Sequence, residues 1–569
     1  MRLFNRFLLG SSGLCLAWLA GCSVDPGDGP GGAAGAGNGA GAASVAGSAG
    51  APGLPGAGNT GVAGAGNPGG GAGANGGSSA NGGASANAGA SNGAGSGNSG
   101  AASGGSANGG SNNNGGSGGS APNGPPTGVT VATHDLSVNG MGTVFNVADN
   151  YFNDGLVPAT PVANFGCQSQ ITAVANDDGS LDIAWLNYAG GKGKPWALPT
   201  PGMIYITHVD AALGTATTTA SGINSYKLLG FTKDTDGAFY VAFNKDHALK
   251  SSTAGDQNNL NGNELHVAKL TGGNVTWDQL LFGNQDNNAD ATPGDPGGAA
   301  SGVLGYDPMN KRLVLYAGHS MMWTPTRHQA GYLRILNPDS GAVIPPAGDD
   351  ILHFGAGWFY SHNFNQRLLI DGGNYYVLAH GDAYARQLGF ARWSLANYTG
   401  KNATDFDQPY FKIDGNQGDN NTNAQTGQFI RLGDGRFAIV HTSSQGRSAR
   451  DVRLVFANGT NGAADAASAR WLTTNQGTTH ATMPKIEQLG DYLLVTYALW
   501  DKGHQLTWYA TVLDGKGATV AAPKLVPDVE FVDAAPLFRF KGGPNAGRVG
   551  WVSGNAAHTV SVRVASLAY

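Results

Sequence analysis

Beyond Thr130, hydrophobic and polar residues alternate in short runs, and almost no stretch of ten or more residues shows helical spacing. Alternation with a period of two is typical of β-strands that bury one face. Pairs of such runs are separated by polar turns that often contain Asp-Gly, as in QITAVANDDGSLDIAW from Gln170 to Trp185. Asp-Gly favours the positive backbone torsions of tight hairpins. The pattern predicts an all-β domain over residues 128–569.

These hairpins repeat along the chain. A hairpin followed by a third alternating strand occurs seven times, and each second strand contains a β-branched residue at the matching place. The matching residues recur at intervals of roughly 61 positions. They are Ile183, Val241, Val314, Val377, Ile439, Val495 and Val549. A weaker fourth strand fits before the next copy, for example TWDQLLFG from Thr276.

Seven four-stranded repeats of this length predict a seven-bladed β-propeller, in which each copy forms one blade. A pair of β-sandwiches is the competing all-β fold, but it would not produce seven similar units. The pattern resembles the seven-bladed propellers of exported bacterial proteins, over about residues 130–569. No particular enzyme family is matched, because the sequence contains neither the Asp-box of sialidases nor the Trp-Asp and kelch motifs. The fold by itself therefore settles no function.

The seventh copy has three strands, because the chain stops at Tyr569 directly after the third. A closed ring needs a fourth strand for this blade. The unassigned strand-like segment lies near the start of the domain, at residues 142–148 (GTVFNVA). We expect this N-terminal segment to complete the last blade and close the ring.

The start of the chain has the features of an export signal, with Arg2 and Arg6 followed by an apolar stretch over 7–20 that is short for a spanning helix. The stretch leads into LAGC, ending at Cys22, which resembles the lipobox of bacterial lipoproteins. The resemblance implies removal of residues 1–21 and attachment of lipid to Cys22, with acyl chains such as palmitate. An ordinary secretory signal is the alternative. We expect a lipid-anchored protein of the bacterial cell envelope, at the outer membrane or the cell surface.

Residues 22–127 consist mostly of Gly, Ala, Ser and Asn, with no aromatic residue and only the charges of Asp25 and Asp28. Such a tract cannot bury enough apolar surface to fold, so we expect a disordered tether with a reach of about 50–60 Å. The formal net charge of −6 argues against a nucleic-acid partner. We expect a monomer that is attached to the membrane through its lipid.

Histidines occupy corresponding places in several copies. Propellers generally bind ligands at the face where first strands begin and second strands end, on loops that a rigid scaffold positions. Histidine is a common catalytic base and metal ligand, so a group of histidines on that face is the default site hypothesis. Histidines at such places are His247, His319, His362, His380, His441 and His480.

The fourth copy is the densest in reactive side chains, which are His362 before its first strand and His380, Asp382, Tyr384 and Arg386 after its second. His362 or His380 could abstract a proton while Tyr384 protonates a leaving oxygen. Arg386 could bind a carboxylate or sulfate of an acidic sugar. Propeller polysaccharide lyases use similar sets, so a lyase or hydrolase acting on an acidic glycan is an alternative by analogy. A structural role is favoured, in which Asp382 pairs with Arg386 and the histidines bind backbone groups.

Two tryptophans, Trp323 and Trp500, fall in loops on the expected face and could stack on sugar rings. The expected binding set combines them with His319, Asp382, His441 and His480. The leading interpretation is a propeller that binds an extracellular glycan or surface protein at this face. An envelope scaffold without a small ligand is the third possibility.

Metal-binding patterns in the sequence are incomplete. Asp286-x-Asn288-x-Asp290 matches the start of a calcium loop but lacks its Gly and its twelfth-position Glu. The sequence contains no P-loop and no paired cysteines for zinc. We therefore expect no cofactor and no bound metal.

Overall fold

The computed structural model describes residues 124–138, 171–187, 201–225, 228–245, 264–282, 302–323, 326–344, 358–361, 363–381, 388–398, 411–412, 425–500, 506–526, 535–555 and 559–569. The expected signal peptide, the expected lipidation site Cys22 and nearly all of the expected tether lie outside these ranges. Within the ranges, no helix is long and apolar enough to cross a membrane.

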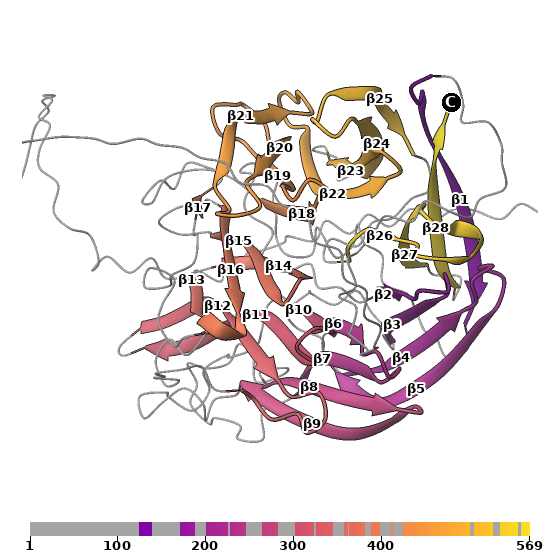
Figure 1. The fold of residues 1–569 in the computed structure, drawn as a ribbon, viewed down its shortest axis with the longest axis vertical. Coiled ribbons are helices and arrows are strands. Elements are labelled where there is room, and N and C mark those ends of the chain that lie inside the picture. The colour runs from indigo at the N-terminus through magenta and orange to yellow at the C-terminus, as the bar shows by residue number, and fades with distance from the viewer. Residues whose placement is uncertain are drawn as a thin grey trace, which may run out of the picture. The chain divides into compact units, whose positions relative to one another are not determined.

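The described residues form seven antiparallel four-stranded sheets (Figure 1). The first strands are β2 (Ile171–Ala175), β6 (Leu228–Lys233), β10 (Gly302–Asp307), β14 (Asn363–Asp371), β18 (Gln425–Arg431), β22 (His480–Leu489) and β26 (Phe538–Arg539). The second strands are β3 (Leu181–Asn187), β7 (Phe239–Lys245), β11 (Arg312–Trp323), β15 (Asn374–Gly381), β19 (Phe437–Ser443), β23 (Tyr492–Trp500) and β27 (Val549–Asn555). The third strands are β4 (Gly202–Val209), β8 (Glu264–Thr271), β12 (Thr326–Leu336), β16 (Leu388–Ser394), β20 (Asp451–Ala457), β24 (Leu506–Leu513) and β28 (Thr559–Ala568). The fourth strands are β5 (Ala216–Ser225), β9 (Asn274–Phe282), β13 (Trp358–Ser361), β17 (Phe411–Lys412), β21 (Ala464–Trp471), β25 (Thr519–Leu525) and β1 (Gly128–Ser137).

The sheets are arranged as the blades of a ring. First strands of neighbouring sheets contact one another from β2 through β6, β10, β14, β18 and β22 to β26, and β26 contacts β2 again. Figure 1 shows the blades in chain order around this ring, from indigo to yellow. Within each blade the order runs outward from the first strand to the fourth. The domain is therefore the seven-bladed β-propeller that the repeat predicts.

The core lies between neighbouring blades. The seven β-branched residues of the repeat are all fully buried, as the repeat predicts. Val241 of β7, for example, belongs to the same core cluster as Ala184 of the preceding blade. Val314 differs, because it joins the core shared with blade four, whereas Leu313 and Leu315 join the core shared with blade two. The alignment of the repeat is thus displaced by one residue in β11, which moves Val314 to the other face of its strand.

The last blade is completed by β1, from the N-terminal side of the domain. β1 pairs with β28 in antiparallel register along its whole length, from Gly128 opposite Ala568 to Ser137 opposite Thr559. Closure of the ring by an N-terminal strand is confirmed. The prediction that 142–148 forms this strand is wrong, because β1 occupies the place, and 142–148 lies outside the described residues. The exposed Thr and Asp positions of β1 and its half-buried His134 obscure its alternation in the sequence.

The two rims of the ring differ in construction. At the turn rim, first strands connect to second strands through the short segments 176–180, 234–238, 308–311, 372–373, 432–436, 490–491 and 540–548. At the loop rim, second strands end and first strands begin, and connections such as 188–201 are longer. Gly179, Gly237 and Gly435 of the Asp-Gly turns have φ values of 90°, 89° and 86°. The positive torsions predicted for these turns are therefore confirmed.

Candidate functional site

The predicted site positions that the structure describes lie near the loop rim. His441 is near the end of β19, and His480 is the first residue of β22. For four more positions the structure gives only the strand to which they belong. His319 and Trp323 are in β11, His380 is in β15 and Trp500 is in β23. The remaining predicted residues lie outside the described residues, and these are His247, His362, Asp382, Tyr384 and Arg386.

Strand register brings two predicted positions together, because His480 lies directly opposite Trp500 in the β22–β23 pair. Trp323 and Trp500 were predicted to fall in loops, but each is the last residue of a second strand. β11 and β12 continue as a hairpin past the end of their pairing with β10. His319 is on this hairpin, so its backbone does not belong to the inner wall that the first strands form.

A polar row crosses blade five near the loop rim. Thr426 of β18 lies opposite His441, and His441 lies opposite Arg453 of β20. Arg453 lies opposite Trp471 of β21. Residues directly opposite in an antiparallel sheet share a face, so these side chains follow one another from the innermost strand to the outermost. Thr426 and His441 are fully buried, whereas Arg453 and Trp471 are half-buried, so the row runs from the interior to the surface.

Asp451, at the start of β20, is the centre of a buried hydrogen-bond network beside this row. Its carboxylate accepts hydrogen bonds from the Thr473 hydroxyl at 2.8 Å and from the backbone N–H of Asn475 at 2.7 Å. Arg447 donates to the same carboxylate through Nε at 2.5 Å. The Arg447 guanidinium also lies over the Trp471 ring, 4.5 Å from its centre. The network fixes the connection 444–450 against the outer strands of blade five.

His480 joins blade six to blade five. Its Nδ1 accepts a hydrogen bond from the backbone N–H of Arg450 at 3.1 Å. The backbone N–H of Ala481 donates in turn to the Arg450 carbonyl at 2.8 Å. An Nδ1 atom that accepts a hydrogen bond carries no proton, so the imidazole of His480 is neutral with its hydrogen on Nε2. Protonation of Nδ1 would remove this contact between the blades.

The electrostatic environment keeps both imidazoles neutral. Burial lowers the pKa of His441 to about 3, and the positive charge of Arg453 acts in the same direction. Burial also lowers the pKa of His480 to about 4, with the charge of Arg450 adding to the shift and that of Asp451 opposing it. Because both side chains are buried, they face protein groups in this structure and support the rim from within.

Sequence reasoning did not single out the arginines and the aspartate of this region. The signal that could have found them is the run QGRSARDVR from Gln445 to Arg453, in which three arginines surround Asp451. The run falls at the connection between a second and a third strand, next to the loop rim. Trp471 gives no such signal, because only the strand register places it beside Arg453.

We predict that acidification destabilises the domain through these histidines. A histidine whose pKa is lower in the folded chain than its ordinary 6.5 gives full stability above pH 6.5 and loses it as the pH falls. Each histidine removes about 1.4 kcal/mol per pH unit between pH 6.5 and its folded pKa. Burial raises the pKa of Glu487 from 4.5 to about 7. The folded chain therefore takes up a proton at this carboxyl as the pH falls from 7 to 4.5, which increases the free energy of unfolding and opposes the effect of the histidines.

Urea unfolding measured from pH 7.5 to 4.5 tests this balance. The two histidines each lower the free energy of unfolding as the pH falls, and Glu487 raises it by a similar amount. The net decrease is about 1.4 kcal/mol per pH unit between pH 6.5 and 4.5. Glu487→Gln should roughly double the loss, and His480→Gln should remove most of it. If the free energy of unfolding changed with pH equally in the parent and in both variants, His480 and Glu487 would not be the groups responsible.

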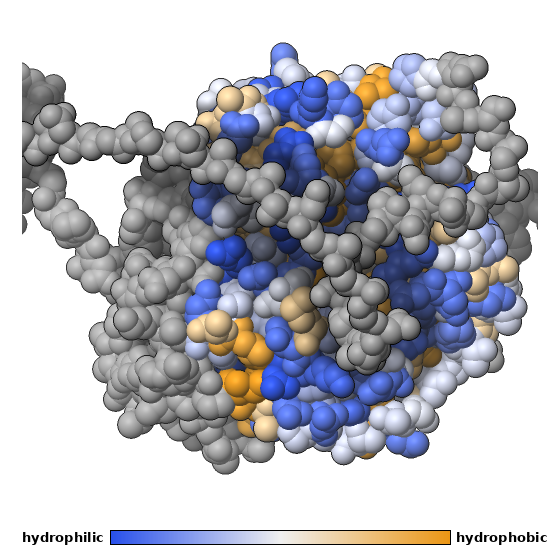
Figure 2. Space-filling model, viewed as in Figure 1, coloured by the Kyte–Doolittle hydropathy of each residue, from blue (hydrophilic) through white to orange (hydrophobic). Residues whose placement is uncertain are grey.

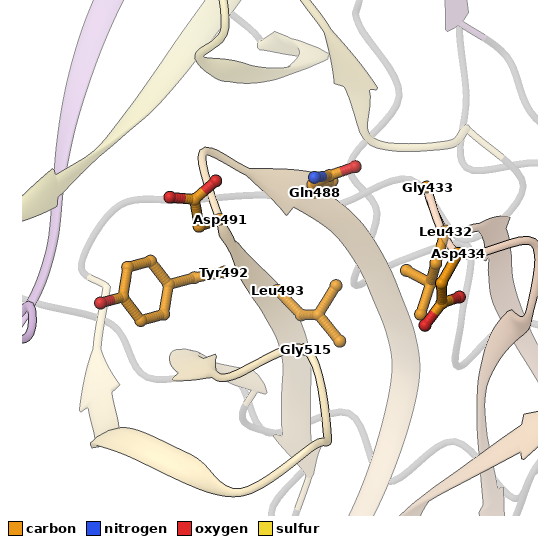
Figure 3. Close-up of a pocket in the computed structure, with 8 residues that line it drawn as sticks. All are labelled: Leu432, Gly433, Asp434, Gln488, Asp491, Tyr492, Leu493 and Gly515. Carbon is orange, nitrogen blue, oxygen red and sulfur yellow. The ribbon is translucent and has the colours of Figure 1, made fainter. Parts of the chain in front are cut away.

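A small cavity of about 160 Å³ lies between blades five and six at the turn rim. Its lining residues are Leu432, Gly433, Asp434, Gln488, Asp491, Tyr492, Leu493 and Gly515. Figure 3 shows Asp434 and Asp491 on opposite sides of the view, so the two carboxylates do not converge on one point. Ligand pockets generally start at about 300 Å³, and this cavity is therefore not the candidate site.

The described surface has a polar character. Figure 2 shows mainly hydrophilic residues on the face in view, with apolar residues in small groups. Among the residues placed by the structure, no three His, Cys, Asp or Glu side chains gather in a way that would hold a metal ion. Among the described residues near the loop rim, blade five contributes hydrogen-bonding groups, guanidinium charges and the Trp471 ring.

Fold and rim together define the class of the protein as a seven-bladed β-propeller, yet no protein-family model and no curated protein matches the chain. Among solved structures, a protein of unknown function from Dyadobacter fermentans has 13% identity and a TM-score of 0.38, covering 68% of this chain and 98% of that one. A protein from Lactobacillus plantarum has 11% identity and a TM-score of 0.35, covering 66% and 92%. The sialidase of Trypanosoma rangeli in complex with the inhibitor DANA has 11% identity and a TM-score of 0.33, covering 62% and 56%. At these values the similarity assigns neither a family nor an activity.

Proposed function

We propose that the protein is an exported, lipid-anchored β-propeller that binds an extracellular ligand, a glycan, at its loop rim. The observation that carries the proposal is the unequal construction of the two rims. The connections between first and second strands, all at the turn rim, have two to nine residues, whereas the loop rim includes the longer connections 188–201, 246–263 and 283–301 together with the histidine, arginine and tryptophan positions described above. The alternative ligand is a surface protein, and the test must distinguish it from a glycan.

The lengths of the connections support binding at the loop rim. Binding residues are disproportionately carried on loops that a rigid scaffold positions. Residues 188–201 join β3 to β4, 246–263 join β7 to β8, and 283–301 join β9 to β10. The connections between first and second strands at the turn rim, by comparison, are as short as 372–373 and 490–491.

The place where the chain enters the propeller also supports this face. Third strands run in the same direction as first strands, so β28 ends at the turn rim, and Gly128 of β1 lies opposite Ala568 there. The backbone N–H of Thr127 donates to the Ala568 carbonyl at 2.7 Å, which fixes the chain at that rim. The expected tether would therefore join the propeller at the turn rim and not at the loop rim, where we propose that the ligand binds.

A glycan array probed with the full chain tests the proposal. We expect binding by the parent protein and at least a tenfold loss of affinity in Trp500→Ala, because this position ends β23 at the loop rim. The matched control is Tyr569→Ala, which removes an aromatic residue that is 55% exposed at the turn rim. Its affinity should stay within twofold of the parent. Thermal unfolding of each variant checks that the fold is retained.

Other outcomes would oppose glycan binding at the loop rim. Equal losses in Trp500→Ala and Tyr569→Ala would place the contact elsewhere. Binding to a purified envelope protein without binding to any glycan would replace the ligand class. Release of unsaturated uronates, followed by absorbance, would instead support a lyase that uses His362, His380, Tyr384 and Arg386. The anchor is tested separately by palmitate labelling, which Cys22→Ser must abolish.

A further inference from the structure

We propose that Tyr497, Tyr509 and Leu525 of blade six, here called the tyrosine row, form a subsite for a neutral pyranose ring of an oligosaccharide. The inference rests on the proposed glycan-binding function. It adds the class of sugar and the side chains that contact it.

The tyrosine row crosses blade six from the interior to the surface. Tyr497 of β23 lies directly opposite Tyr509 of β24, and Tyr509 lies opposite Leu525 of β25. Tyr497 is 2% exposed, Tyr509 is half-buried and Leu525 is 50% exposed. Figure 1 shows the three strands in this blade. Leu525 is the last residue of β25, so the exposed end of the row lies at the loop rim.

The two tyrosines have hydroxyls that no protein group uses. Their rings are stacked, with centres 5.6 Å apart and planes 13° apart, so packing fixes both side chains. Among the residues that the structure describes, neither phenol hydroxyl has a hydrogen-bond partner. A buried hydroxyl without a partner costs free energy, and a ligand that forms the missing hydrogen bond recovers it.

The hydroxyl of Tyr497 can act as a donor to a ligand. Burial raises the pKa of Tyr497, and the negative charge of Asp451 acts in the same direction, so the phenol keeps its proton. The hydroxyl oxygen is not one of the fully buried polar atoms that lack a partner. The small exposed part of this side chain therefore includes its oxygen.

The corresponding row of blade one separates packing from binding. Trp185 has the place of Tyr497 in the repeat and stacks on Tyr205, with ring centres 4.6 Å apart. Its N–H group is satisfied, because it donates to the Thr207 hydroxyl at 2.9 Å. The outer neighbour of Tyr205 is Ala220, which offers little apolar surface. Stacking thus serves packing in both blades, whereas the unsatisfied buried hydroxyl and the exposed leucine distinguish blade six from blade one.

The row fits a pyranose with equatorial hydroxyls, such as the glucose units of cellulose. A ring of this kind has C–H bonds on its two faces and hydroxyls around its edge. Its C–H face can pack on Leu525 and on the exposed part of Tyr509, while an edge hydroxyl accepts a hydrogen bond from Tyr497. The three side chains carry no charge, so an acidic sugar gains no ion pair from them.

Calorimetric titration of the full chain with cellopentaose tests the buried end of the row. Tyr497→Phe removes the hydroxyl and keeps the ring, and we expect an affinity loss of about fivefold, the value of one neutral hydrogen bond. Its urea midpoint should equal or exceed that of the parent, because no protein contact is lost. The control is Tyr205→Phe, which removes a hydroxyl from the matching third-strand position of blade one. Its affinity should stay within twofold of the parent.

Leu525→Lys tests the exposed end of the row. It removes apolar surface from the contact, and we expect an affinity loss of about tenfold. The control is Val275→Lys, which makes the same kind of change at a residue that is 42% exposed near the start of β9, at the turn rim. Its affinity should stay within twofold of the parent. Both positions are on the surface, so the urea midpoints should match.

The possible results separate this inference from the proposed function. Unchanged affinity in Tyr497→Phe, or a lower urea midpoint, would overturn the subsite. A loss in Leu525→Lys without a loss in Tyr497→Phe would replace the sugar with an apolar partner such as a surface protein. Binding of the parent to other glycans on the array, but not to cellopentaose, would overturn the subsite and leave glycan binding intact. A lack of binding to any glycan would overturn the proposed function itself.

Discussion

Replacing Val129 and Leu136 of β1 by aspartate will destabilise the whole propeller, because these two buried side chains hold the strand that closes the ring. Each loses about 1.5–3 kcal/mol of hydrophobic burial, and the buried charges add to the loss, so we expect at least about 3–6 kcal/mol together. With β1 displaced, β28 becomes an exposed edge, which promotes association between chains. Urea unfolding and light scattering of the full chain measure the two effects.

The control for this prediction lies in the same strand. Thr130 and Ser137 are the exposed neighbours of the two buried residues, so the double change Thr130→Asp with Ser137→Asp adds the same charges on the solvent side. Exposed substitutions of this kind cost at most about 0.5 kcal/mol each. If both double variants were equally stable, β1 would not be the strand that holds the ring closed.

Loss of the Asp451 carboxylate should have the second largest effect. Asp451 is fully buried and accepts hydrogen bonds from Thr473, Asn475 and Arg447. Asp451→Ala leaves these donors without their acceptor, and removing one partner of a buried charge pair costs about 3–5 kcal/mol. We therefore expect a large fall in the free energy of unfolding, measured in urea at neutral pH.

Asp434 provides the matched control for Asp451. It is also paired with an arginine of blade five, Arg436, but its side chain is 51% exposed at the turn rim. Solvent-exposed pairs contribute about 0–1 kcal/mol, so Asp434→Ala should be close to the parent. Combining Asp451→Leu with Arg447→Met removes both charges and should recover part of the stability. A double variant as unstable as Asp451→Ala would contradict the charge-pair explanation.

The repeat predicted the blades from local pattern, and the structure confirms them. Alternation, Asp-Gly turns and seven recurring β-branched residues are all local properties, and each describes how a single blade buries its faces. Val314 marks the limit of this reasoning, because a displacement of one residue in β11 leaves the residue buried and changes which neighbouring blade it contacts. The sequence pattern predicts that a residue is buried more reliably than it predicts which blade that residue packs against.

The closing strand shows a second limit. That an N-terminal strand closes the ring was predictable, since the seventh copy lacked one strand. Which strand does so was not, because β1 is an outermost strand with several exposed polar positions and hence weak alternation. The choice is made by ten paired positions with β28, and those contacts link residues at the two ends of the domain.

The candidate site was predictable in position and only partly in composition. Strand-end reasoning led to His441 and His480, and the structure places both near the loop rim. Their burial and their low pKa values arise from the packing of blades five and six, which no single strand reveals. Arg453 and Trp471 become neighbours only through the pairing of β20 with β21.

By itself, the sequence determined that the chain forms seven β-blades with tight turns at one rim and histidines at the other, because strand alternation and turn chemistry are encoded within a few residues. The tertiary structure alone decided which strand closes the ring, which faces meet between blades and which charges gather beside Trp471. Those features depend on contacts between residues far apart in the chain, whose register is selected by the packing of whole sheets against one another.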